Sequence, residues 1–251
     1  MSEFANKSYW LIGASEGMGR ALARKLSAEG ASLILSARSA DRLNELAAEL
    51  PRASVLPFDV TKMDEVRAAV AEVGSVDRVV YNAGAYDPMR ATDWQTDAAL
   101  AICDVNFLGV MRVMGEIVPG MVQAGRGDIT LVGSLAGYRG LPAAIGYGAS
   151  KAAVISLTQS AGLDLIRHGI NVNAIAPGVV DGEHWDGVDA FFARYEGKAP
   201  GQKKREVGEA VPYGRMGRAE DLTGMAVFLA SSEADYIVAQ TYNVDGGNWM
   251  S

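Results

Sequence analysis

Three residues in the middle of the chain have types that suit proton transfer at a hydroxyl or carbonyl group: Ser134, Tyr147 and Lys151. Tyr147 and Lys151 are four residues apart, a spacing that places them on one face of a helix. A free tyrosine has a pKa of about 10, so it is protonated at neutral pH and is a poor base. A nearby lysine cation favours the phenolate and lowers such a pKa by roughly 1–3 units. We therefore predict that Tyr147 acts as a general acid–base and that Ser134 holds the reacting oxygen beside it.

A glycine-rich turn near the N-terminus, GASEGMG from Gly13 to Gly19, has the composition of a phosphate-binding loop. Gly13 permits a tight turn, Gly17 lets the backbone approach a pyrophosphate, and Gly19 lets the following helix pack closely on the sheet. The free N–H groups at that helix start attract phosphate. A nicotinamide dinucleotide bound there would supply the hydride chemistry, and its positive charge would also favour the Tyr147 phenolate.

Short apolar runs alternate with longer helical stretches along the whole chain. The pattern predicts strands at 9–13, 32–36, 54–58, 78–81, 128–132, 170–175 and 241–244. It predicts helices at 18–29, 39–50, 62–73, 147–168 and 220–231, and a helical region at 95–124 that could be two helices. Strands that alternate with helices and mostly lack polar alternation indicate a doubly wound parallel sheet, an α/β fold of the Rossmann type. Residues 1–251 are expected to form one domain. Ligands bind outside the carboxyl ends of such strands, so Ser134 and the start of the next helix are predicted to share one cleft.

One stretch, from Pro177 to Pro212, has no clear periodicity. A segment of that length is usually a lid or a binding loop, and disorder is the alternative. We expect substrate choice to depend on residues 179–211, with help from 85–90 and 135–145.

The glycine spacing GxxxGxG is joined by further motifs in a fixed order: Asp59-Val60, Asn82-Ala83-Gly84, Asn106 within DVNFLG, YGASK at 147–151, and Pro177-Gly178. Together they resemble the short-chain dehydrogenase/reductase family over essentially the whole chain, with Tyr81 in place of that family's first asparagine. The resemblance implies a catalytic set of Asn106, Ser134, Tyr147 and Lys151. Lys151 would also hold the nicotinamide ribose, and Asn106 would help to hold a water that relays protons to solvent.

The same resemblance implies the residues that contact the cofactor. They are Gly13, Ser15, Glu16, Gly17, Met18, Gly19, Arg38, Asp59, Val60, Asn82, Ala83, Gly84, Tyr147, Lys151, Pro177 and Gly178. It also implies a homo-oligomer, a tetramer or a dimer, and the small residues Ala149, Ala152 and Ala153 on a largely apolar helix suit such packing.

The choice between NADP and NAD depends on residues near the cofactor's adenine ribose. The family usually places an acid at the end of the second strand for NAD, and this chain has Ala37 followed by Arg38. Arginine binds a 2′-phosphate with charge-assisted hydrogen bonds, which favours NADP. Glu16 opposes it, because its charge would repel that phosphate. NADP is therefore favoured and NAD stays open.

The two halves of the sequence resemble different branches of the family. Residues from about Lys151 onward resemble sorbitol- and galactitol-type polyol dehydrogenases, whereas Ala37-Arg38, YNAG and LVGSLAGYRGLP resemble an NADP-leaning branch. We therefore expect a secondary alcohol as substrate, and a polyol or sugar alcohol is one candidate. We also consider a mosaic of two parents joined near 147–153. A catalytically weak or silent nucleotide-binding sensor or scaffold is the alternative function, and the intact Ser134, Tyr147 and Lys151 argue against it.

Composition excludes several other classes of protein. A net charge of −7 argues against a nucleic-acid surface. Cys103 is the single cysteine and is expected to pack as a small hydrophobe. No signal peptide or membrane-length apolar run is evident, so we expect a cytoplasmic protein without a membrane partner. His168 is expected to cap a helix, His184 could face substrate or solvent, and the two give no metal site.

Overall fold

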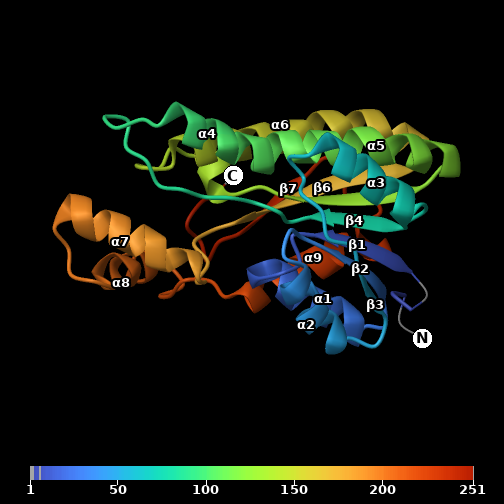
Figure 1. The fold of residues 1–251 in the computed structure, drawn as a ribbon, viewed down its shortest axis with the longest axis horizontal. Coiled ribbons are helices and arrows are strands. Elements are labelled where there is room, and N and C mark those ends of the chain that lie inside the picture. Colours follow the sequence, from blue (N-terminus) through green and yellow to red (C-terminus); the bar gives the residue numbers. More distant parts are fainter. Residues whose placement is uncertain (1–2, 6, 251) are drawn as a thin grey trace.

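The computed structural model describes residues 3–5 and 7–250 and places seven parallel strands in one sheet (Figure 1). The strands are β1 (Ser8–Ile12), β2 (Ser32–Ser36), β3 (Ala53–Val55), β4 (Arg78–Tyr81), β5 (Gly127–Val132), β6 (Ile170–Pro177) and β7 (Thr241–Val244). Their order across the sheet is β3-β2-β1-β4-β5-β6-β7. This confirms the predicted α/β Rossmann-type fold, whose topological switch point lies between β1 and β4.

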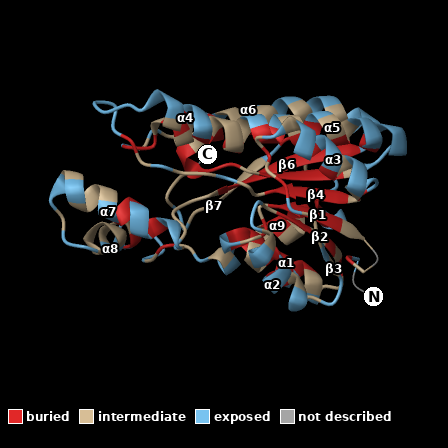
Figure 2. Ribbon diagram, viewed as in Figure 1, coloured by how far each residue is buried: buried red, intermediate tan, exposed pale blue. Residues whose placement is uncertain are grey.

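Helices cover both faces of the sheet. One layer contains α1 (Gly17–Ala28), α2 (Ala40–Ala48) and α9 (Ala219–Leu229). The other contains α3 (Met63–Val73), α4 (Thr96–Cys103), α5 (Gly109–Ala124) and α6 (Ile145–Leu165) (Figure 1). Each layer has its own core against the sheet, and the strands between them are the most deeply buried elements (Figure 2). Strands covered on both faces need no polar alternation, which explains why the apolar runs located them correctly.

The segment predicted to be irregular, Pro177 to Pro212, contains two helices, α7 (His184–Glu196) and α8 (Gln202–Glu209). This corrects the sequence prediction. Trp185 and Val188 bury one side of α7, and the indole Nε1 of Trp185 donates to the Val180 carbonyl at 2.9 Å. Asp189 accepts hydrogen bonds from the backbone N–H groups of Gly201 and Lys204, so a side chain of α7 caps the start of α8. The two helices project from the body beside the carboxyl ends of the strands (Figure 1).

The helical region 95–124 is continuous but changes register in its middle. A short π-helical segment, Asp104–Leu108, joins α4 to α5, so the expected two helices meet at this point. Such bulges occur frequently at functional sites. By length and composition alone, Thr96–Ala124 is long and apolar enough to cross a membrane. It packs as a core helix, however, because α4 contacts α6 and α5 contacts α3, with Val113 and Ile117 in the core.

Candidate active site

The glycine-rich loop lies at the switch point of the sheet, where it follows β1 and adjoins the end of β4. The Asn82 side chain, at the end of β4, donates to the Gly13 carbonyl at 2.8 Å. The expected cofactor residue Asn82 therefore also fixes the loop. Gly13 has a φ of +90°, and a Cβ there would lie 2.4 Å from the Ala83 nitrogen, so only glycine fits.

The other two loop glycines have different roles. A Cβ on Gly19 would lie 2.0 Å from the Gly13 carbonyl oxygen, so this glycine allows α1 to pack against the loop. A Cβ on Gly17 would meet no atom within 4 Å, and its φ is +51°. Space is thus open above the start of α1. The N-cap residue Glu16 makes no side-chain cap, and no acid occupies the first turn. This open cradle of N–H groups fits a pyrophosphate.

The other expected cofactor residues differ in how much of the side chain is accessible to a ligand. Arg38 is exposed after β2, and its charge acts on Asp59, which accepts from the Thr61 N–H at 2.9 Å. Val60 and Met18 are buried in the core, so only their backbones are available to a ligand. At the end of β6, the Gly178 N–H donates to Val244, and a Cβ on Gly178 would lie 2.6 Å from Asp245.

Ser134, Tyr147 and Lys151 converge at the carboxyl ends of β5 and the start of α6, as predicted. Ser134 follows β5 and its hydroxyl accepts from the Ala136 N–H at 3.1 Å. A hydrogen bond also links the Ser134 and Tyr147 side chains. The Lys151 Nζ donates to the Val132 carbonyl at 2.7 Å and lies 5.7 Å from the centroid of the Tyr147 ring. The arrangement puts a hydroxyl, a phenol and an ammonium group in one small volume.

Desolvation dominates the electrostatics of this group. Burial raises the pKa of Tyr147, and the hydrogen bond with Ser134 offsets only part of the rise. This differs from the expected lowering of the pKa by Lys151. Burial also lowers the pKa of Lys151 to about 8, which leaves the amine mainly charged at pH 7. The protein alone therefore holds Tyr147 as a phenol, the form that donates a proton to a carbonyl oxygen.

The buried charge of Lys151 carries a stability cost. Its pKa falls from 10.5 to about 8 on folding, so the unfolded state binds more protons between these values. Stability from this group is therefore lowest below pH 8 and rises as the pH increases toward 10.5. We expect Lys151→Met to raise the free energy of unfolding by about 2 kcal/mol at pH 7, with the gain shrinking above pH 10. Denaturant unfolding at both pH values measures this, and a gain that is the same at both would contradict it.

Asn106 lies in the π-helical segment and is 1% exposed. Its Oδ1 accepts from the Ala85 N–H at 2.7 Å, and its Nδ2 donates to the Ala85 carbonyl and to Ser150 Oγ, both at 3.0 Å. The side chain thus ties the loop after β4 to α6, next to Lys151. A Cβ on Gly84 would lie 3.5 Å from Asn106 Oδ1 and 3.7 Å from Lys151 Nζ, which shows how close these groups are.

Sequence reasoning did not single out three residues, although Tyr86 lies within the segment 85–90 that was expected to help substrate choice. Ser150 partners Asn106, and Tyr86 makes an edge contact with Tyr147 at 5.0 Å between ring centroids. Arg42, on α2, pairs with Glu16 at 2.5 Å. Of the three, Arg42 was the one that the sequence could have revealed. It follows Arg38 by four residues, and a second cation near a phosphate loop suits an anionic ligand. The other two contacts join distant segments and have no local pattern.

The other residues singled out in the sequence lie apart from Ser134, Tyr147 and Lys151. His168 ends the 3₁₀ turn that follows α6, at the opposite end of that helix from Tyr147. Cys103 is partly buried, and burial raises its thiol pKa. Tyr81, the departure from the family pattern, donates its hydroxyl to the Val105 carbonyl at 2.8 Å and so binds the π-helical segment to β4. His184 begins α7 at the wall of a cavity.

Known proteins match this chain along nearly its whole length. A family model described as enoyl-(acyl carrier protein) reductase matches residues 13–248. The chain is 52% identical to sorbitol dehydrogenase of Cereibacter sphaeroides over 251 residues, and 98% of each chain is covered. It is 46% identical to galactitol 2-dehydrogenase of Agrobacterium fabrum strain C58 over 252 residues, again covering 98% of each.

Solved structures agree with the sequence relatives. A variant of actinorhodin polyketide ketoreductase with NADPH has a TM-score of 0.93 at 30% identity and covers 99% of this chain and 100% of that chain. Levodione reductase has a TM-score of 0.90 at 27% identity and covers 98% of each. The chain therefore belongs to the short-chain dehydrogenase/reductase family and is an NAD(P)-dependent oxidoreductase that interconverts an alcohol and a carbonyl compound by hydride transfer.

Proposed function

We propose that this enzyme oxidises a secondary hydroxyl of a sugar alcohol to a ketone, with Tyr147 as the catalytic acid–base. The observation that carries the proposal is the convergence of Ser134, Tyr147 and Lys151 beside the open cradle at Gly17. The polyol substrate is supported by the two dehydrogenase relatives that align over 98% of the chain.

In this mechanism Ser134 and Tyr147 hold the substrate hydroxyl between them. Ser134 donates to or accepts from the reacting oxygen and fixes its position. A nicotinamide dinucleotide held at the Gly13–Gly19 loop would supply the hydride acceptor, and the positive charge of its oxidised ring would favour the phenolate form of Tyr147. Tyr147 takes the hydroxyl proton as the C–H hydride leaves, so the alcohol loses one hydride and one proton and becomes a carbonyl. Reduction runs through the same steps in reverse.

The proton must then leave Tyr147. Lys151 is the neighbouring ionisable group, and a pKa near 8 suits a residue that passes protons near neutral pH. Asn106 fixes the loop at Ala85 and the start of α6 around it. We propose that Asn106 keeps this region rigid and that a water held there relays the proton from Lys151 to solvent.

The reaction is tested by mixing the protein with sorbitol or galactitol and either oxidised cofactor, and following the reduced nicotinamide. Steady formation of reduced cofactor supports the proposal. Reduction of simple ketones without oxidation of any polyol would contradict the polyol assignment and retain the family chemistry.

We propose NADP as the preferred cofactor. Arg38 is exposed and makes no hydrogen bond or ion pair with the other described residues, which leaves its guanidinium available to a 2′-phosphate. Glu16, the residue that argued for NAD, is paired with Arg42 at 2.5 Å. The ion pair reduces the repulsion that Glu16 would exert, although both side chains are about half exposed and such a pair is weak.

Two substitutions separate these contributions. Arg38→Ala is expected to weaken NADPH binding roughly tenfold, the value of one charge-assisted contact, and to leave NADH binding nearly unchanged. Glu16→Gln removes the closest partner of Arg42, which then keeps only Glu183 at 3.7 Å, and is expected to tighten NADPH binding by a few-fold. Titration of nicotinamide fluorescence measures both. If Arg38→Ala weakens the two cofactors equally, the 2′-phosphate assignment is wrong.

We propose a homo-oligomer that uses the outer surface of α4, α5 and the end of α6. Six large apolar side chains there are 38–66% exposed: Leu100, Leu108, Met111, Val122, Leu163 and Ile166. Exposed apolar residues gathered on one side of a fold mark an interaction surface. The same helices show exposed outer faces in Figure 2. Light scattering that gives the mass of a single chain would contradict this proposal.

The other hypotheses drawn from the sequence have less support or stay open. A silent sensor is not favoured, given the polyol dehydrogenase relatives and the assembled catalytic group. The comparisons do not support a mosaic, because one sorbitol dehydrogenase aligns across both halves. We retain 179–211 as the substrate-binding region, since α7 lines the cavity next to Tyr86. A cytoplasmic location stays a prediction.

A further inference from the structure

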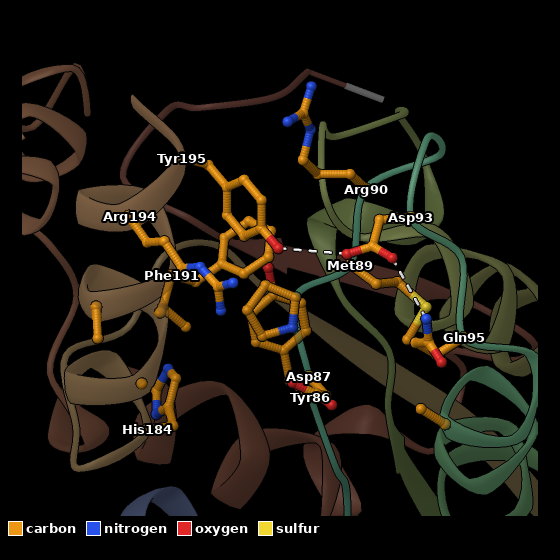
Figure 3. Close-up of a pocket in the computed structure, with 15 residues that line it drawn as sticks. Tyr86, Asp87, Met89, Arg90, Asp93, Gln95, His184, Phe191, Arg194 and Tyr195 are labelled. Carbon is orange, nitrogen blue, oxygen red and sulfur yellow. Dashed lines mark hydrogen bonds between the residues drawn. The ribbon is translucent and has the colours of Figure 1, made fainter. Parts of the chain in front are cut away.

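A cavity of about 530 Å³ lies between α7 and the loop that follows β4, a size typical of small-molecule sites (Figure 3). Tyr86 forms part of its wall, and the edge of the Tyr86 ring contacts the ring of Tyr147, with centroids 5.0 Å apart and planes at 68°. One aromatic ring therefore separates the cavity from the catalytic group. A chain-like substrate with one hydroxyl at Tyr147 has room to extend past Tyr86 into this space.

The cavity wall combines aromatic rings with polar groups. Phe191 and Tyr195 lie on α7 with their ring centroids 4.6 Å apart, and Tyr86 lies on the facing loop. Such rings pack against the C–H groups of a polyhydroxylated carbon chain while leaving its hydroxyls free to hydrogen-bond at the ring edges.

Two charged side chains on opposite walls retain hydrogen-bonding capacity. Asp87, on the loop, and Arg194, on α7, make no hydrogen bond or ion pair with any other described residue; Arg194 only stacks over Tyr195 at 5.4 Å. Asp93 differs, because its carboxylate already accepts from Gln95 and Tyr195 at 3.3 Å. Asp87 offers acceptors and Arg194 offers a fork of donors, which together match neighbouring hydroxyl groups. Figure 3 shows the two residues on the two walls.

The charge balance of the cavity favours a neutral ligand over an anion. Two arginines, Arg90 and Arg194, are matched by two acids, Asp87 and Asp93. His184 also lines the wall, and partial burial lowers its pKa, so the neutral imidazole adds one donor and one acceptor at pH 7. A carboxylate or phosphate would face Asp87 and Asp93 as like charges.

We propose that this cavity is the subsite for the distal hydroxyls of the substrate, and that Asp87 and Arg194 determine specificity for long polyols. The inference rests on the proposed polyol oxidation and identifies which part of the substrate the enzyme reads beyond the reacting carbon. Neither residue contacts the reacting group, so both act through binding.

The test compares a six-carbon with a four-carbon polyol, sorbitol and erythritol, in wild type, Asp87→Ala and Arg194→Met. The wild type is expected to prefer sorbitol, because only the longer chain reaches the cavity. Each variant is expected to lower kcat/KM for sorbitol roughly tenfold, mainly through KM, with a much smaller change for erythritol. Arg52→Met, an exposed arginine next to the amino end of β3, is the matched control. Thermal unfolding verifies that all variants fold.

Each outcome has a distinct meaning. An unchanged sorbitol-to-erythritol ratio in both variants would overturn the subsite. Faster oxidation of gluconate than of sorbitol, lost in Arg194→Met alone, would overturn it in favour of an anion site. Oxidation of no polyol by the wild type would instead remove the proposed function on which the subsite rests.

Discussion

Replacing Tyr147 by phenylalanine is expected to lower kcat for polyol oxidation by about 10²–10⁴, the usual contribution of a general acid–base. The variant keeps the ring and its edge contact with Tyr86, and loses only the hydroxyl that hydrogen-bonds to Ser134. The loss should appear in kcat, because the proton transfer happens only in the transition state. Initial rates under saturating cofactor and substrate measure it.

Binding and fold must be unchanged for this result to be informative. Cofactor affinity, measured by nicotinamide fluorescence, should stay within a few-fold of wild type. Tyr9→Phe is a suitable control, since its buried hydroxyl donates to the Ala230 carbonyl at 3.1 Å and lies outside both the catalytic group and the expected substrate region. A Tyr147→Phe enzyme with more than a tenth of the wild-type kcat would show that another residue or water serves as the acid–base.

Gly17→Ala is expected to weaken cofactor binding roughly tenfold to a hundredfold while the protein stays folded. The new Cβ would occupy the open space above the start of α1, where the pyrophosphate is proposed to lie. Because the φ of Gly17 is +51°, the substitution also costs about 1–2 kcal/mol of folding free energy. Cofactor titration and denaturant unfolding measure the two effects.

Gly74→Ala is the matched control for backbone strain. Gly74 caps α3 with a φ of +62°, and a Cβ on it would likewise meet no atom within 4 Å. It should lose about as much stability as Gly17→Ala with no change in cofactor affinity. Gly19→Ala should behave differently again, because its Cβ would be 2.0 Å from a backbone oxygen and overpacking costs about 3 kcal/mol. If Gly74→Ala weakens cofactor binding as much as Gly17→Ala, the phosphate assignment is wrong.

The sheet was predictable because its information is local. The buried residues 9–12 of β1 and 79–81 of β4 appear in the sequence as short apolar runs, and the alternation with helices then fixes a parallel sheet. Element ends were less accurate. β3 ends at Val55 rather than at Phe58, although Leu56 and Phe58 still donate backbone hydrogen bonds to β2 and the residue after it.

The two helices of the substrate region were not predictable in the same way. α8 buries only Gly208, so it has no apolar stripe, and it is held by contacts from α7. Asp189 caps its first turn, and Lys203 pairs with Glu196 at 3.1 Å. These interactions join residues of two different helices, and neither periodicity nor composition reveals them.

The candidate site likewise combines features that the sequence predicts with features that only the three-dimensional structure reveals. Ser134, Tyr147 and Lys151 were predictable because strand ends and helical spacing bring them together. The direction of the Tyr147 pKa was not, because it depends on how deeply the surrounding structure buries the ring. Tyr86 and Arg42 were missed since their roles come from tertiary contacts with Tyr147 and Glu16.

The central claim, hydride transfer from a secondary carbon of a polyol, is tested most directly with sorbitol carrying deuterium at carbon 2. After turnover with oxidised cofactor, mass spectrometry and NMR identify the sugar product and the position of the label. The account predicts a ketose, with the deuterium transferred to the reduced nicotinamide. A ketose that keeps the deuterium would place the oxidation at another secondary carbon, and an aldose would contradict the account.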